Sequence, residues 1–165
     1  MSKVTAKKVQ GNNAEIKKKK DSLLTMKEAI TQASEIIEKT RHCLVATNGD
    51  DGYPNIKTMT NRKHDGFKTI WFATDTSSNR VQQLKRDKRA CVYCLDAETA
   101  KGLMLVGDME ILHDIELKRM IWIKGEEKYN PLGVEDPEWC LLRFTAKRAN
   151  VVDAMQNKGL TFEIE

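Results

Sequence analysis

The sequence contains no long apolar stretch and no glycine-rich loop of the kinds that hold nucleotide phosphates. No segment approaches the roughly 20 apolar residues that a membrane-spanning helix needs, and the N-terminus lacks the apolar core of a secretory signal. Neither G-x-x-x-x-G-K-[ST] nor G-x-G-x-x-G occurs, which excludes the usual mononucleotide and dinucleotide loops. We therefore expect a soluble, cytoplasmic protein that does not enter a membrane.

The cysteines give little support for metal or disulfide chemistry. The chain has four of them, namely Cys43, Cys91, Cys94 and Cys140. Cys91 and Cys94 form a C-x-x-C, but they lie in a strand-forming run, where a spacing of three sends two side chains to opposite faces. No second C-x-x-C and no closely spaced histidine pair accompanies them. We predict no metal site, and four reduced cysteines that are all buried as small apolar side chains.

Positive charge is concentrated at the start of the chain. The net charge is +4, but residues 1–20 carry seven lysines and one glutamate, so the remaining residues sum to −2. A near-neutral body lacks the basic face of a dedicated nucleic-acid reader, and nucleic acid is not an expected partner. A length of 165 residues fits one domain. We predict a disordered basic tail over residues 1–24 and a single domain over residues 25–165.

Helix signals occur at three places. Thr25 and Glu28 fit a capping box, and apolar residues then recur at the spacing of one helical face as far as Ile37. Residues 76–78 supply helix-start chemistry for residues 79–86, and Asp114 can cap a third helix that runs to Trp122. We expect one amphipathic helix and two short ones.

Strand signals outnumber helix signals. Six runs rich in β-branched, aromatic or alternating apolar residues are expected to be strands: 42–47, 55–61, 67–74, 90–95, 103–112 and 139–145. The pair Asp65-Gly66 predicts a hairpin between the second and third runs, and Gly107 predicts a bend in the fifth. Residues 151–165 give no clear signal. The pattern favours an α+β fold with one antiparallel, barrel-like sheet over a parallel nucleotide-binding fold.

Two segments carry a resemblance to a known family. Residues 52–59, Gly-Tyr-Pro-Asn-Ile-Lys-Thr-Met, resemble its "G-x-P-x-x-R-x-M" strand. Residues 70–80, Ile-Trp-Phe-Ala-Thr-Asp-Thr-Ser-Ser-Asn-Arg, resemble its "F-x-T-x-x-x-S-x-K" strand-to-helix turn. The family is the pyridoxamine 5'-phosphate oxidase-like, FMN-binding split-barrel family, in its general stress protein-like branch. The resemblance covers most of residues 28–147 and implies an antiparallel split β-barrel of about six strands with short peripheral helices.

The resemblance also implies a binding site for FMN. Backbone groups of two strands would hold the isoalloxazine ring, and a basic turn would hold the phosphate. Lys57 stands where the family usually has arginine, and Arg80 where it usually has lysine, so both charges are kept. The residues implied to bind the cofactor are Lys57, Thr58, Met59, Thr60, Phe72, Ala73, Thr74, Ser77, Ser78, Asn79, Arg80 and, from a partner subunit, Trp122.

The chemistry of the turn agrees with this assignment without the family name. A phosphate monoester favours hydroxyl donors, a fixed cation and the free amides of a helix N-terminus, and residues 76–80 offer all three. The alternatives are that Ser78 is only a helix cap and that Lys57 is a solvated charge. Asp75 would repel a phosphate unless its side chain turns away.

The resemblance implies an FMN-dependent oxidoreductase that acts on a small molecule, with NAD(P)H as a candidate electron donor. A homodimer with the cofactor at its interface is expected as well. The alternative is a module that binds flavin, or haem, without turnover, and some related barrels use a deazaflavin. The arginine- and histidine-bearing segment with which true pyridoxamine phosphate oxidases read their substrate is not found after Val151, so that reaction is not expected.

Overall fold

The computed structural model describes residues 23–165, so the predicted basic tail lies outside the described residues except for its last two positions. Leu24, one of those two, is buried, and its backbone amide donates to the carbonyl of Gly159 over 3.3 Å. No helix among the described residues is long and apolar enough to cross a membrane.

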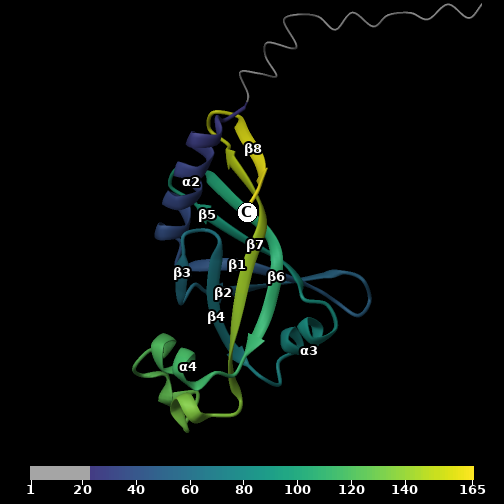
Figure 1. The fold of residues 1–165 in the computed structure, drawn as a ribbon, viewed down its shortest axis with the longest axis vertical. Helices are drawn as coiled ribbons and strands as arrows, with labels where there is room; N and C mark the ends of the chain where they lie inside the picture. The colour runs from purple at the N-terminus through teal and green to yellow at the C-terminus, as the bar shows by residue number, and fades with distance from the viewer. Residues whose placement is uncertain (1–22) are drawn as a thin grey trace, which may run out of the picture.

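Residues 23–165 form an antiparallel sheet of eight strands with three α-helices packed around it (Figure 1). The strands are β1 (His42–Asn48), β2 (Pro54–Thr60), β3 (Lys63–Asp65), β4 (Thr69–Asp75), β5 (Arg89–Asp96), β6 (Lys101–Leu112), β7 (Trp139–Asp153) and β8 (Lys158–Glu163). Seven follow the order β2-β1-β5-β6-β7-β4-β3, and β8 pairs with β7. The two terminal strands of this order, β2 and β3, are joined through only Asn61 and Arg62. The sheet therefore curls into an open half-barrel, as expected of an α+β split barrel.

The longest strands carry the curvature. The pairing of β6 with β7 shifts register between Val106 and Gly107, and a Cβ atom at Gly107 would overlap the carbonyl oxygen of Thr145. The bend predicted at this glycine is confirmed, because only a residue without a side chain lets the two backbones approach so closely. β7 runs along most of the molecule, with the β7–β8 hairpin at one end and α4 at the other (Figure 1).

One sequence-based expectation about the sheet was wrong, and the sheet has more strands than the sequence predicted. The Asp65-Gly66 turn does not join residues 55–61 to the next run; it joins the short strand β3 to β4, and β2 pairs with β1 instead. The sheet has eight strands rather than about six, because β3 and β8 gave too little local signal to be predicted. β7 also continues to Asp153, past the predicted end.

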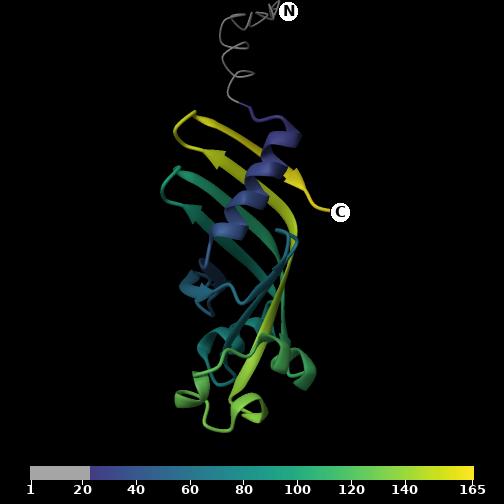
Figure 2. The same cartoon turned by 90° about the vertical axis from the view of Figure 1, so that its left-hand side faces the viewer.

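The three helices begin where their capping residues predicted. α2 (Met26–Lys39) has a complete capping box between Thr25 and Glu28. α2 lies across the sheet (Figure 2), where it contacts β5, β6, β7 and β8, and its buried residues are Ala29, Ala33, Ile36 and Ile37. α3 (Asn79–Arg86) is capped by Ser78, and α4 (Ile115–Ile121) by Asp114. Two short 3₁₀ helices, η1 (Glu126–Lys128) and η2 (Gly133–Glu135), lead from α4 towards β7.

Buried side chains form two clusters. The main core lies between α2, α3 and the concave face of the sheet and includes Phe72, Leu105 and Phe144. A smaller cluster around Trp139, Ile121 and Leu141 lies under α4. β7 contributes to both clusters, so this strand connects the two ends of the molecule.

The cysteines are all free, and those of β5 point to opposite faces as predicted. Cys94 is buried with its sulfur 2.9 Å from that of Cys43. Cys91 is only half-buried on the outer face, so the expectation that all four would be buried was wrong for this residue. Burial raises the pKa of the Cys91 thiol, which therefore stays protonated at neutral pH.

Candidate functional site

The candidate site is built around the turn between β4 and α3. Strand alternation points Thr74 to the same inner side as the buried Phe72, and it points Asp75 to the other side. The amide of Ser78 donates to the carbonyl of Asp75 over 3.1 Å. The Ser78 hydroxyl accepts from the amide of Val81 over 3.4 Å and so caps α3. The Asp75 carboxylate therefore points away from Thr74 and from the Ser78 cap.

Arg80 extends from the first turn of α3 to this inner side. Its Nη1 donates to the hydroxyl of Thr74 over 3.2 Å. Burial lowers the pKa of the Arg80 guanidinium, but an arginine remains charged at neutral pH. Within residues 23–165 no carboxylate forms an ion pair with it. Arg80 is therefore a half-buried cation that still has N–H groups free to donate to a ligand.

A second cation comes from β2. Lys57 is opposite Val45 in the ladder with β1, and Asn55 is opposite Thr47, so both β2 side chains share the inner face with buried residues of β1. β2 pairs only with β1, and Lys57 consequently emerges at the edge of the sheet. Like Arg80, it has no ion-pair partner among the residues that the structure describes.

These side chains surround one cavity of about 280 Å³, which we call the cation cavity. Its walls are Thr47, Asn55, Lys57, Ser78, Asn79, Arg80 and Gln83. They include two cations, two hydroxyls and three amides, but no carboxylate. Such a set of donors suits a small dianion, because each anionic oxygen can accept from a cation, a hydroxyl or an amide.

The turn is held in place from both sides. On one side, the Thr47 hydroxyl donates to Oε1 of Gln83 over 2.7 Å and ties α3 to β1. On the other, the amide of Ser77 donates to the Glu138 carboxylate over 2.7 Å, and the amide of Thr76 to the Glu138 carbonyl over 2.7 Å. Hydrogen bonds from the side chain and backbone of Ser77 hold the pKa of the Glu138 carboxyl below its ordinary value. The cation cavity therefore has a wall fixed before any ligand arrives.

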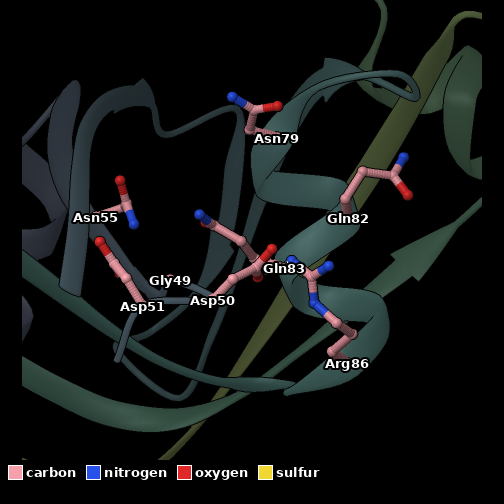
Figure 3. Close-up of a pocket in the computed structure, with 8 residues that line it drawn as sticks. All are labelled: Gly49, Asp50, Asp51, Asn55, Asn79, Gln82, Gln83 and Arg86. Carbon is pink, nitrogen blue, oxygen red and sulfur yellow. Dashed lines mark ion pairs between the residues drawn. The ribbon is translucent and has the colours of Figure 1, made fainter. Parts of the chain in front are cut away.

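A second cavity of about 390 Å³ adjoins the first (Figure 3). Its walls are Gly49, Asp50, Asp51, Asn55, Asn79, Gln82, Gln83 and Arg86, of which Asn55, Asn79 and Gln83 also line the cation cavity. Asp50 of the β1–β2 turn forms an ion pair with Arg86 of α3. We call this space the acidic cavity, since its charged residues are two aspartates and one arginine.

Four of the predicted cofactor residues, Lys57, Ser78, Asn79 and Arg80, line the cation cavity together, and a fifth, Thr74, contacts Arg80. The other predicted residues lie elsewhere. Met59 and Phe72 are buried in the main core, Ala73 packs against the smaller cluster, and Thr58, Thr60 and Ser77 are outside the cavity wall. Cofactor contacts by these six residues, through backbone or side chain, stay predictions.

Trp122 lies at the α4 end of the molecule and not at the cation cavity. Its ring packs edge-on against Trp139, with centroids 4.9 Å apart and planes at 83°. Its indole nitrogen donates to the Glu127 carboxylate over 3.4 Å. The predicted approach of Trp122 to a cofactor from a partner subunit stays a prediction.

Three cavity residues, Thr47, Asn55 and Gln83, were missed in the sequence. Asn55 could have been found, because it lies two positions before Lys57 and shares its face of the strand. Gln83 lies three and four positions after Arg80 and Asn79, which places it on their side of α3. Thr47 comes from a different strand, and only the pairing of β1 with β2 brings it to the cavity.

Comparison with known families gives one match over most of the chain. Residues 28–164 match the model of the family described as "Pyridoxamine 5'-phosphate oxidase like". Comparison with curated protein sequences gave no match.

Solved structures agree with the family match. A Clostridium acetobutylicum protein described as related to general stress protein 26 of Bacillus subtilis is 42% identical; the alignment covers 85% of this chain and 97% of that one with a TM-score of 0.75. An FMN-binding, pyridoxamine 5'-phosphate oxidase-related protein from Nostoc punctiforme is 17% identical, with coverage of 85% and 95% and a TM-score of 0.55.

A haem-binding protein from Mycobacterium smegmatis shares the fold as well. It is 16% identical, with coverage of 85% of this chain and 60% of that one and a TM-score of 0.68. At such low identity this likeness, and the one to the Nostoc protein, extend to the fold alone. The match of the family model over residues 28–164 and the 42% identity to the Clostridium protein go further: the chain belongs to the pyridoxamine 5'-phosphate oxidase-like family.

Proposed function

We propose that this protein binds FMN and uses it for oxidation or reduction of a small molecule. The observation that carries the proposal is the cation cavity, where Lys57 and Arg80 face the Ser78 cap without a carboxylate partner among the described residues. Two unpaired cations and a helix N-terminus are an unfavourable arrangement unless an anion neutralises them. A phosphate monoester carries nearly two negative charges at neutral pH and so matches the two cations in number.

The residues present fit the phosphate end of FMN. Arg80 would donate two parallel hydrogen bonds, Lys57 would act as a point charge, and the Ser78 hydroxyl would donate while its oxygen keeps the helix cap. Asn79 and Gln83 add amide donors at the wall. Residues 57–60 and 72–74 are the segments that would hold the ring through their backbone groups, and they would orient it and exclude water from it. FMN supplies hydride chemistry when bound, and the chain supplies position and electrostatics.

Haem is the second candidate, because the Mycobacterium smegmatis neighbour is described as binding it. Haem iron takes an axial ligand from histidine, cysteine, methionine or tyrosine. None of the seven residues that line the cation cavity is of these types. We therefore favour FMN over haem at this site.

We propose further that the protein is a homodimer. The outer face of the sheet carries Leu44, Tyr93 and Met104 side by side, since the register pairs Leu44 with Tyr93 and Tyr93 with Met104. Ile56 extends the same face on β2. An apolar face of this kind is typical of an interface, and two-fold association would cover it with its own copy.

A fluorescence titration of the purified protein with FMN tests the cofactor. We expect quenching of flavin fluorescence at a one-to-one ratio, together with flavin absorption bands. The double substitution Ser78→Ala/Arg80→Ala should weaken binding about 100-fold, since it removes two contacts to a charged group. The control Ser34→Ala/Arg148→Ala changes the same residue types on α2 and β7, away from the cavity, and should bind as the unaltered protein does. Equal binding by both variants would contradict the phosphate site.

Oxidation of NADH or NADPH by the FMN-loaded protein, with a chemical electron acceptor present, tests for turnover. Sustained oxidation supports an oxidoreductase. Tight FMN binding without any oxidation of either nicotinamide would favour the alternative function, a module that carries flavin without turnover.

A further inference from the structure

The acidic cavity is the polar space next to the proposed phosphate position, and its charge is opposite to that of the cation cavity. Asn55, Asn79 and Gln83 form a wall common to both. The shared wall gives a group attached to a phosphate in the cation cavity a direct route into the acidic cavity. At about 390 Å³ the acidic cavity is the larger of the two, so a lack of space does not keep such a group out.

The arginine of the acidic cavity is neutralised by its neighbour. Arg86 and Asp50 form an ion pair, and the Arg86 side chain is 55% exposed. With this pair formed, the charge left on the wall is that of Asp51, whose Oδ1 accepts from the amide of Tyr53 over 3.1 Å. A second phosphate would be repelled by the Asp51 carboxylate, and Arg86, being already paired with Asp50, would attract it only weakly.

We propose that the Asp50–Arg86 pair makes the site selective for a single phosphate and rejects dinucleotides such as FAD. FAD carries the FMN phosphate joined by an anhydride to a second phosphate and adenosine, and we take this second phosphate to extend across the shared wall, where it would meet the pair. The inference rests on the proposed function, because it takes the flavin phosphate to lie in the cation cavity. Asp50 acts here by occupying Arg86, and selectivity arises from repulsion rather than from shape.

The substitution Asp50→Asn tests whether selectivity arises from charge rather than from shape. It is nearly isosteric, and the turn around it is held by backbone bonds, from Gly49 to the Tyr53 carbonyl over 2.8 Å and from Gly52 to the Gly49 carbonyl over 3.1 Å. The variant frees Arg86 for a second phosphate. Fluorescence titrations should show that the unaltered protein binds FMN more tightly than FAD. In the variant, FAD binding should tighten about tenfold, with FMN binding changed less than about twofold.

Two further variants complete the test. Adding Arg86→Gln to Asp50→Asn should remove the gain for FAD, because the freed cation is gone. The control Glu98→Gln removes one negative charge at the distant β5–β6 turn and should change neither affinity. A circular dichroism spectrum checks that each variant is folded.

The outcomes separate the two proposals. Equal binding of FMN and FAD by the unaltered protein, or an equal gain for both flavins in Asp50→Asn, would overturn the selectivity device while the FMN site stands. A gain for FAD that persists without Arg86 would overturn it as well. Binding of neither flavin by the unaltered protein would overturn the proposed function, and this inference with it.

Discussion

Two neighbouring rows of side chains cross the same three strands, β1, β5 and β6, and differ in how far they are buried. The inner row, Val45, Val92 and Leu105, is 0% exposed throughout. The outer row, Leu44, Tyr93 and Met104, is one residue away along each strand, and its members are 44%, 36% and 36% exposed. Both rows are apolar, so composition does not distinguish them.

The difference shows which apolar side chains a single chain buries and which it leaves exposed. The inner row ends on β2 at Lys57, where the core gives way to the cation cavity, and the outer row ends at Thr58. Burial of the inner row stabilises the single chain. The outer row contributes nothing comparable unless another surface covers it, which is the reason for proposing a dimer.

The largest effect is expected for a substitution in the inner row. Leu105→Ala should lower the free energy of unfolding by about 2–5 kcal/mol, since it leaves a cavity in a fully packed core. Met104→Ala, the adjacent position in the outer row, should change it by less than about 0.5 kcal/mol at protein concentrations at which the chain is monomeric. Urea unfolding of the two variants measures both values. Similar losses for the two would mean that the rows do not differ in the way described.

A smaller effect on stability, but a clear one on assembly, is expected for the outer row. Tyr93→Lys places a charge in the centre of the apolar face and should convert a dimer to a monomer, as measured by sedimentation equilibrium. Met155→Lys is the matched control, because Met155 is 80% exposed in the β7–β8 turn. If the unaltered protein is monomeric, or if Tyr93→Lys leaves a dimer intact, the outer row is not the interface.

The smallest effect on the free energy of unfolding is expected at Asp108. This residue of β6 lies opposite Arg89 of β5, where the outer face of the sheet becomes charged. Hydrogen bonds from Lys147 and Lys88 hold the pKa of the Asp108 carboxyl below its ordinary value. A carboxyl whose pKa is lowered by folding stabilises the protein above its unfolded pKa, and this contribution is lost as the pH falls through the folded pKa. Asp108→Asn should therefore cost at most about 1 kcal/mol at pH 7 and nothing in strong acid. Unfolding at several pH values measures the difference; a cost independent of pH would contradict the charge effect.

Local signals in the sequence were sufficient for parts of the fold. Thr25, Ser78 and Asp114 each cap a helix through a side chain that acts within three residues, so the sequence alone locates the three helix starts. Gly107 is another local signal, because the close approach of β6 and β7 at the bend requires a residue without a side chain. The two motifs around Lys57 and Arg80 indicated which segments form the cation cavity.

Non-local pairing accounts for what could not be predicted. The three-residue strand β3 and the short strand β8 are fixed by pairing with β4 and β7, which their own residues do not specify. The partner of β2 was mistaken for the same reason, since the Asp65-Gly66 turn indicates a hairpin but not which strand enters it. Thr47 joins the cavity only through the register of β1 with β2.

The hydrogen bond from the Ser77 amide to Glu138 joins residues 61 positions apart. During synthesis on the ribosome, the turn that precedes α3 leaves the exit tunnel long before Glu138 does. Its final fixation must wait for the start of β7, and long-range contacts of this kind form slowly. The wall of the cation cavity is therefore completed late in folding, only after the start of β7 has reached the turn.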